Sequence, residues 1–506
     1  MSRPVRVRFA PSPTGPLHIG GVRTALFNYL FAKKHGGTFF LRIEDTDRTR
    51  LVPGAEDYIL EALDWLGIAP DETVGRNEKF GPYRQSDRKH IYKEYAEALI
   101  NSGNAYYAFD SNDSLDALRK SHEEAGETFI YNHHNREKLD NSLRISTGET
   151  QRRIAAGEDY VIRFKTPVGE ILHLHDIIRG DIKFDTNLLD DKVLFKSDGM
   201  PTYHLANIVD DHLMETSHVI RGEEWLPSMP LHVLLYRAFS WEAPEFAHLP
   251  LILKPVGNGK LSKRDGDKLG FPVFPLDWKT ADGTSPGYRE QGYFPEAVIN
   301  FLALLGWNDG SEKELFSLEE LTASFDLGRV HKSGAKFDPE KNKWFNHQYL
   351  IRRDNALLAK EFSPMLAAKG IEVSKIGAAK LERIVSLIKE RASFVSELSL
   401  LGDFFFFAPA TYDEKASKNW KDETPNLMSA LCKVLEPIAD FTSPNIEEIV
   451  KTWMATNEIG MGKIMQPLRL SLVGELKGPH IFDIIEILGK KETLERINTV
   501  ISKIRC

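Results

Sequence analysis

The chain has 506 residues, of which 42% are hydrophobic and 27% are charged, and its formal net charge is −8. This composition is ordinary for globular proteins and excludes a collagen-like, low-complexity or wholly disordered chain. The negative net charge means that any surface binding nucleic acid must be local. The length predicts several domains rather than one.

The longest apolar stretches, residues 301–307 and 404–408, are far shorter than the roughly 20 residues that span a bilayer. Arginines interrupt the first residues, where a leader would need an apolar core. We therefore expect a cytoplasmic protein with no membrane partner. The two cysteines, Cys432 and Cys506, are too few for a disulfide framework or a cysteine-rich zinc site.

The first 66 residues predict a parallel βαβ unit followed by a helix. Residues 5–9 indicate a strand, the loop 10–21 leads into a helical pattern, and residues 39–43 indicate a second strand. Residues 56–66 are again helical in pattern. This order of elements is typical of a doubly wound, Rossmann-like α/β fold.

The remaining chain predicts three further regions. Residues from about 110 to 190 are polar and mixed, which indicates a domain inserted between Rossmann segments 1–110 and 190–255. Residues 249–253 indicate a strand and residues 295–305 a helix, within a region spanning 255–350. Beyond residue 350 the helical period dominates to residue 506, which predicts an α-helical region of two subdomains.

The loop Ala10–Gly21 connects a predicted strand to a predicted helix. In open α/β sheets, ligands bind at the carboxyl ends of strands, where the N–H groups of a helix N-terminus can bind phosphate. Gly20 permits close approach of a nucleotide, and His18 can donate a hydrogen bond to a phosphate as negative charge develops. The alternative is that a histidine beside glycines is simply part of the loop. Taken alone, this motif favours that alternative.

A second motif, Lys260-Leu261-Ser262-Lys263-Arg264, follows a predicted turn at Asn258-Gly259. Lysines on such a loop can neutralise phosphate groups. A basic pentamer by itself is more often a solvated surface. The combination of both motifs is therefore more informative than either one.

Together the two motifs resemble the HIGH and KMSKS elements of class I aminoacyl-tRNA synthetases, with Gly21 and Leu261 as departures. Further segments narrow the resemblance to the bacterial glutamyl-tRNA synthetase family. They keep the family's order and cover most of residues 1–350: RFAPSPTGPLHIGG, LRIEDTDRTR, GPYRQSDR, DGMPTYHLANIVDDHLMETSHVIRGEEW, KLSKRDGD and QGYFPEAVINFLALLGW.

The resemblance implies a glutamate–tRNA ligase (EC 6.1.1.17). Such an enzyme activates L-glutamate with ATP to glutamyl-adenylate and pyrophosphate, then transfers glutamate to the 3′-terminal adenosine of tRNA(Glu). The implied catalytic residues are His18, Lys260, Ser262 and Lys263. The implied ATP-binding residues are His18, Gly20, Glu224, Leu253 (through its backbone) and Lys263.

By the same resemblance, Arg8 and Arg221 face the glutamate carboxylates, Glu44 and Ser12 hold the amino end, and Tyr203 and Asn207 add hydrogen bonds. A guanidinium fork requires acceptor oxygens, so it should reject the amide of glutamine by several kcal/mol. The alternatives are a strand-end surface position for Arg8 and a structural ion pair of Arg221 with Glu223 or Glu224. Asp210 and Asp211 are interpreted as scaffold rather than as a metal site.

The resemblance also implies that residues 110–190 hold the acceptor end of tRNA and that activation requires tRNA. Arg391 and Arg469 match arginines that face the anticodon, although exposed helix arginines are the common alternative. We expect Mg²⁺ to arrive with ATP and no metal to be held by the protein. In particular we expect no zinc, because residues 99–190 contain no cysteine. A monomer is expected.

Residues 270–287 stand out as an insertion rich in proline and aromatics, which predicts an ordered excursion. It either packs near the active-site mouth or makes a lineage-specific tRNA or lid contact. Three alternative functions are a glutaminyl-tRNA synthetase, a truncated paralogue that glutamylates a modified tRNA base, and a catalytically inactive tRNA-binding relative. The helical last third counts against the first two, and the intact histidine and lysine motifs count against the third.

Overall fold

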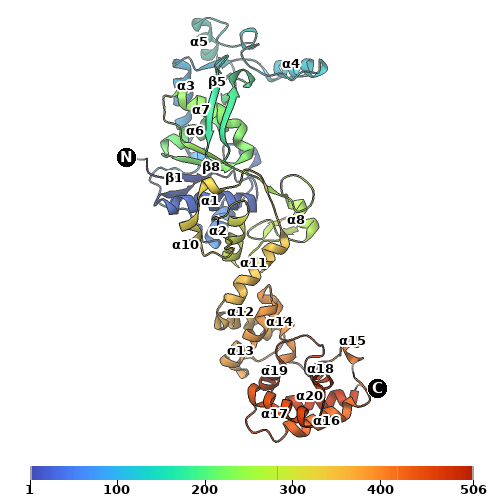
Figure 1. Ribbon diagram of the computed structural model, residues 1–506. Helices are drawn as coiled ribbons and strands as arrows, with labels where there is room; N and C mark the ends of the chain where they lie inside the picture. The colour runs from blue at the N-terminus through green and yellow to red at the C-terminus, as the bar shows by residue number, and fades with distance from the viewer. Residues whose placement is uncertain (1–2, 282, 419, 504–506) are drawn as a thin grey trace. The chain divides into compact units, whose positions relative to one another are not determined.

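The computed structural model in Figure 1 describes residues 3–281, 283–418 and 420–503, so Cys506 lies outside the described residues. The chain divides into two compact units, one up to Pro339 and the other from Glu340 onward. No helix among the described residues has both the length and the apolar character needed to cross a membrane.

The N-terminal βαβ unit is present as predicted. Strand β1 (Arg6–Phe9) pairs in parallel with β2 (Thr38–Leu41), and α1 (Ile19–Lys34) connects them. His18 is the N-cap of α1, and its side chain accepts a hydrogen bond from the Gly20 N–H. The last turn carries two lysines, whose positive charges interact favourably with the negative end of the helix dipole. The helix is buried on most sides rather than on one face, because α9 (Pro295–Leu304) and α10 (Leu318–Ser324) pack against it.

A second parallel pair, β8 (His218–Gly222) and β9 (Glu245–Leu249), lies beside the first. The Ser217 N–H donates to the Arg6 carbonyl, which brings β8 next to β1. Helices α6 (Tyr203–Leu213) and α7 (Met229–Ala238) pack with these strands. The strand predicted at 249–253 is in fact split: β9 ends at Leu249 and a short β10 (Ile252–Leu253) follows. Pro250, which lacks an N–H, interrupts the ladder.

The inserted region contains two small sheets. Strands β3 (Ala105–Ala108), β4 (Val161–Phe164) and β7 (Val193–Phe195) form an antiparallel sheet, and β5 (Ile171–Asp176) and β6 (Gly180–Asp185) form a hairpin. Helices α2 (Ala55–Trp65) and α3 (Lys89–Asn101) precede it, and α4 (Asn112–Glu124) and α5 (Thr147–Ala155) belong to it.

The lysine motif leads into α8 (Lys263–Leu269), which contains its last two residues. Strands β11 (Trp278–Thr280) and β12 (Gly283–Ser285) then form an antiparallel pair. Strand β13 (Ala335–Lys336) pairs with β10. Residues 270–281 and 283–287 contact the N-terminal βαβ region and the helix that follows it. The Val273 carbonyl accepts from the Ile19 N–H at 2.9 Å, and the Tyr58 hydroxyl bonds both the N–H and the carbonyl of Leu276.

The second unit is helical as predicted, with no strand among its described residues. Leu381, Ile384, Val385 and Ile388 are buried, and Leu387 is half-buried. Its helices, after α11 (Pro339–Arg352), are α12 (Asn355–Ala368), α13 (Ala378–Ile388), α14 (Leu398–Leu401), α15 (Glu414–Ser417), α16 (Thr424–Leu435), α17 (Ser443–Thr456), α18 (Met461–Val473), α19 (Ile481–Leu488) and α20 (Lys490–Lys503).

Candidate active site

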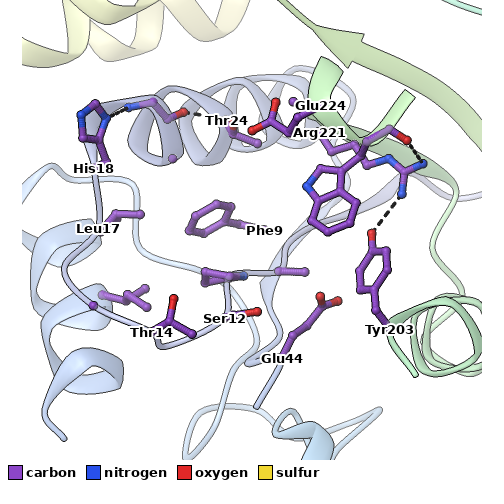
Figure 2. A pocket seen from close by; sticks show the side chains of 18 of the residues that line it. Phe9, Ser12, Thr14, Leu17, His18, Thr24, Glu44, Tyr203, Arg221 and Glu224 are labelled. Atoms are coloured by element: carbon purple, nitrogen blue, oxygen red, sulfur yellow. Dashed lines mark hydrogen bonds between the residues drawn. The ribbon is translucent and has the colours of Figure 1, made fainter. Parts of the chain in front are cut away.

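A cavity of about 970 Å³ opens where β1 and β8 end and α1 begins. In Figure 2, His18 lies at the opposite end of this pocket from Arg221 and Tyr203, with Ser12 and Glu44 between them. The cavity brings together most of the residues predicted from the sequence: Arg8, Ser12, His18, Gly20, Glu44, Tyr203, Asn207, Arg221, Glu224 and Lys260.

Leu253, Ser262 and Lys263 are not among the lining residues. The Leu253 carbonyl instead accepts from the Phe337 N–H at 2.9 Å, and its neighbours Leu251 and Ile252 line the cavity. Lys263 is exposed at the start of α8. These three predicted roles therefore have no direct geometric support in the free protein.

His18 is a neutral hydrogen-bond donor. Its Nδ1 accepts from the Gly20 N–H at 3.2 Å, so the ring proton lies on Nε2, which has no partner within the described residues. Burial, with a smaller effect from the charge of Lys260, lowers the pKa of His18 to about 4. The neutral Nε2–H group at the N-terminus of α1 is therefore a buried donor that lacks a partner among the described residues.

Arg8 is a buried cation that already has a counter-ion. Its Nε and Nη2 donate to the two carboxylate oxygens of Asp211 at 3.0 and 3.1 Å, and Asp211 also accepts from Arg42 at 2.7 Å. Only 3% of Arg8 is exposed, so the alternative of a surface position is wrong. Arg8 also lines the cavity, and its Nη1 makes no hydrogen bond within the described part of the chain.

Arg221 is also buried, but all of its partners are neutral. Its Nε donates to His248 Nε2 at 3.1 Å, and its Nη1 donates to the Tyr203 hydroxyl at 3.1 Å and to His232 Nδ1 at 3.3 Å. Its Nη2 donates to the Trp225 carbonyl at 3.3 Å. Burial lowers the pKa of Arg221. A buried cation held only by neutral acceptors lacks the counter-charge that a bound carboxylate supplies.

Neither neighbouring glutamate pairs with Arg221, so the predicted alternative of a structural ion pair is wrong. Glu223 pairs with Arg179 and accepts from the Leu251 N–H. Glu224 accepts from Lys260 Nζ at 3.1 Å. The family resemblance assigns Glu224 to ATP binding and Lys260 to catalysis, and this contact joins the two.

Glu44 is a buried carboxyl group that lines the cavity. One of its oxygens accepts from Arg42 at 2.9 Å and from the Asn207 amide at 3.3 Å. Burial raises the pKa of Glu44, and the charges of Arg42 and Arg8 oppose this shift. An ammonium group that enters the cavity would find here a carboxylate fixed by hydrogen bonds.

The lysine motif forms a helix start. The backbone N–H and the hydroxyl of Ser262 donate to the Asp265 carboxylate at 2.9 and 2.6 Å, which caps α8. Ser262 therefore has a structural partner that the sequence reasoning did not foresee. Lys260 reaches the cavity from the loop that precedes this cap.

The structure adds site residues that the sequence reasoning missed. Phe274, from the 270–287 insertion, lines the cavity and packs edge-on against His18, with ring centroids 6.0 Å apart. Trp225 packs against Tyr203 with the rings tilted by 32° and their centroids 4.4 Å apart. The Phe-Pro content of the insertion was the only sequence signal for Phe274, and no pattern marked His232 or His248.

Asp210 and Asp211 act as scaffold. Asp210 accepts from Arg88, Gln85 and Tyr92, at 2.7 to 2.9 Å. Both carboxylates are buried, and each pairs with one or more arginine side chains of the described chain.

The two arginines predicted to face the anticodon lie in the second unit. Arg391 is exposed at the end of the 3₁₀ turn Lys389–Arg391, and Arg469 on α18 donates to the Pro479 carbonyl at 2.7 Å. Burial and the positive charge of Arg391 lower the pKa of Arg469. The fold therefore brings these two cations within electrostatic range of each other.

Comparison with known families agrees with this geometry. Residues 4–344 match the catalytic domain of class I tRNA synthetases (E and Q), and residues 357–501 match an anticodon binding domain. The glutamate–tRNA ligase of Flavobacterium johnsoniae is 77% identical, over 99% of this chain and all of the relative, and that of Christiangramia forsetii is 62% identical over all of both.

Solved structures give the same result. The glutamate–tRNA ligase of Elizabethkingia meningosepticum in complex with its amino acid is 54% identical, with a TM-score of 0.94, over 99% of this chain and 100% of the other. The enzyme of Elizabethkingia anophelis is 53% identical, with a TM-score of 0.91 and the same coverage. With an α/β catalytic region followed by a helical anticodon-binding region, the chain belongs to the glutamate–tRNA ligase family of class I aminoacyl-tRNA synthetases.

Proposed function

We propose that this chain attaches L-glutamate to tRNA(Glu) in two steps within the described cavity. Glutamate first reacts with ATP to give glutamyl-adenylate and pyrophosphate, and glutamate then passes to the 3′-terminal adenosine of the tRNA. One observation carries the proposal. Arg221, a buried guanidinium held only by neutral acceptors, shares a cavity with Arg8 and with the phosphate-binding start of α1.

Glutamate carries two carboxylates and one ammonium group, and the cavity offers matching charges. Arg8 and Arg221 would take one carboxylate each, and Glu44 with Ser12 would hold the ammonium group. Tyr203 and Asn207 would add hydrogen bonds from α6. An amide in place of the side-chain carboxylate would place an NH2 donor against a guanidinium donor, which disfavours glutamine.

Activation needs positioning and charge stabilisation rather than a strong base, because the attacking carboxylate is already ionised. A glutamate carboxylate oxygen forms a bond to the α-phosphorus while the bond to the pyrophosphate oxygen breaks. The Nε2–H of His18 and the ammonium groups of Lys260 and Lys263 would stabilise the charge that develops on the phosphate oxygens. Gly20 and Glu224 would border the nucleotide, and Mg²⁺ would enter as part of the MgATP substrate.

The tRNA would contact several regions of the chain. We propose that residues 110–190 bind the acceptor end, residues 255–350 the stem, and residues 350–506 the anticodon, with Arg391 and Arg469 among the reading residues. Two pairs of histidines, at 133/134 and 173/175, offer too few ligands for zinc in the inserted region. The proposal further takes the enzyme to act as a monomer in the cytoplasm.

The decisive experiment is ATP–pyrophosphate exchange with glutamate or glutamine, with and without purified tRNA(Glu). The proposal expects exchange with glutamate only, and only when tRNA is present. Exchange with glutamine would favour the glutaminyl alternative. No exchange under any condition would favour a catalytically inactive tRNA-binding relative.

A further inference from the structure

Two fully buried side chains, Asp176 and His248, lie directly behind Arg221. His248 is on β9 and pairs in register with Arg221 on β8, and Asp176 ends β5 in the inserted region. His248 Nδ1 lies 2.6 Å from Asp176 Oδ2, and Arg221 Nε lies 3.1 Å from His248 Nε2. The three side chains thus form a continuous line of hydrogen bonds.

The chemistry of this line fixes the tautomer of His248. A guanidinium Nε can only donate, so His248 Nε2 must accept and the ring proton must lie on Nδ1. That proton points at the Asp176 carboxylate, which only accepts when ionised. Each end of the line therefore requires the same neutral tautomer, and the other tautomer would set an N–H against the N–H of Arg221.

The Asp176 carboxylate is itself held in place. It accepts from the backbone N–H groups of Ile178 at 3.0 Å, Arg179 at 2.8 Å and His248 at 3.1 Å. Burial opposes ionisation of Asp176, but these donors and His248 lower its pKa overall. The carboxylate is thus an ionised, immobile anchor for the imidazole.

The anchor belongs to a different part of the fold from the guanidinium that it directs. Figure 1 shows the β5–β6 hairpin extending from the inserted region toward the catalytic strands. The tip of the hairpin is fastened to β9, because the Ile177 N–H donates to the Phe246 carbonyl at 2.8 Å and Arg179 Nε donates to the His248 carbonyl at 3.3 Å. The direction of Arg221 is therefore set from the inserted region.

We infer that Asp176 and His248 are positioning residues that aim the guanidinium of Arg221 at the glutamate carboxylate. The inference rests on the proposed role of Arg221 and deepens it, since it makes the hairpin of the inserted region part of amino-acid recognition. Neither residue lines the cavity, so their effect on glutamate would pass entirely through Arg221.

Two substitutions of one residue test the inference. The amide nitrogen of asparagine falls near the Nδ1 position of histidine, so His248→Asn keeps the contact with Asp176 and loses the one with Arg221. The amide oxygen of glutamine reaches the Nε2 position, so His248→Gln can still accept from Arg221. In pyrophosphate exchange with tRNA present, we expect His248→Asn to raise the KM for glutamate about tenfold or more. His248→Gln should retain most of the parent affinity, and the KM for ATP should stay within about twofold in both.

The same substitution in a variant that already lacks Arg221 distinguishes this inference from the proposed function. Arg221→Lys alone should raise the KM for glutamate, and an unchanged KM would overturn the proposed role of Arg221. In the Arg221→Lys background, His248→Asn should add little, because its target is gone. Equal effects in both backgrounds, or equal rises in the KM values for glutamate and ATP, would overturn the inference. Should His248→Asn not fold, Asp176→Asn gives the same comparison, with the same expected selective rise in the KM for glutamate.

Discussion

Arg8 and Arg221 should respond differently to the same substitution, although both are buried and both border the cavity. We consider Arg8→Gln and Arg221→Gln as a matched pair, in which each loses a positive charge and keeps an amide donor. Arg8 neutralises Asp211, whereas Arg221 has only neutral partners among the described residues. The two variants should share a functional defect and differ in stability.

The functional defect follows from the loss of a charged partner for a substrate carboxylate. Removing one member of a buried, hydrogen-bonded charge pair costs about 2–5 kcal/mol. Each 1.4 kcal/mol is about a tenfold change, so kcat/KM for glutamate should fall by roughly 30-fold to a few thousand-fold in either variant. The KM for ATP should change much less, because neither arginine belongs to the proposed nucleotide-binding set.

The stability difference follows from what each substitution leaves behind. Arg8→Gln leaves the buried Asp211 with Arg42 as its one remaining cation. Breaking a buried ion pair costs about 3–5 kcal/mol, and the surviving contact with Arg42 places the expected loss near ~3 kcal/mol. Arg221→Gln removes a buried charge and leaves no buried anion without its partner. The free energy of unfolding of this variant should therefore stay within about 1 kcal/mol of that of the parent.

The assay is thermal unfolding of the substrate-free proteins, followed by calorimetry at pH 7, alongside pyrophosphate exchange with tRNA. We expect a lowered midpoint for Arg8→Gln and a nearly unchanged one for Arg221→Gln. Equal destabilisation of both variants would refute the electrostatic distinction. An unchanged kcat/KM for glutamate in Arg221→Gln would refute the assignment of the pocket.

Three further predictions follow from the site. Lys263→Ala should lower the rate of glutamate activation at least tenfold while tRNA binding is retained. The matched control is Lys268→Ala, because Lys268 is exposed on the same helix. An equal loss of activation in both variants would contradict the proposed role of Lys263 in stabilising the phosphate charge. Tyr58→Phe leaves the N–H and the carbonyl of Leu276 without the hydroxyl that bonds both. The free energy of unfolding, measured with denaturant, should therefore fall by about 1–3 kcal/mol. No loss would show that other contacts fix the 270–287 insertion. Since burial lowers the pKa of His18 to about 4, the unfolded chain binds this proton near pH 6.5 and the folded chain does not, so stability falls from pH 6.5 toward 4. His18→Asn should make that fall shallower than in the parent, and an identical pH dependence would contradict the shift.

Local patterns were enough to predict much of the catalytic fold. The strand predicted at residues 5–9 follows from hydrophobic spacing and is found at Arg6–Phe9. The helix predicted after the loop 10–21 is also present, but it begins at Ile19, inside the predicted loop. The helix at 295–304 follows from the proline at its first position and the glycine beyond its end. Such elements depend on neighbours within a few residues, which is why a sequence can specify them.

The prediction failed where one residue or a distant segment changed the outcome. Pro250 removes a backbone donor and splits the predicted strand at 249–253, although the apolar residues around it are suited to a strand. The motif predicts a catalytic role for Ser262 but does not indicate that its hydroxyl donates to Asp265 at the start of α8. The partners of His248 lie 27 and 72 residues away along the chain, which no local pattern can report.

The state of each arginine in the pocket depends on the tertiary fold and not on its motif. In the sequence, Arg221 is followed closely by Glu223 and Glu224, so an ion pair with one of them is the alternative to a role in glutamate binding. In the fold, it is Arg8 and not Arg221 that has a carboxylate partner. Helix α6 presents Asp211 to Arg8, while β9 and α7 present neutral histidines to Arg221. In the proposed function, a carboxylate bound at Arg8 would therefore meet a guanidinium that already has Asp211 as its counter-ion, whereas one bound at Arg221 would meet a guanidinium held by neutral groups.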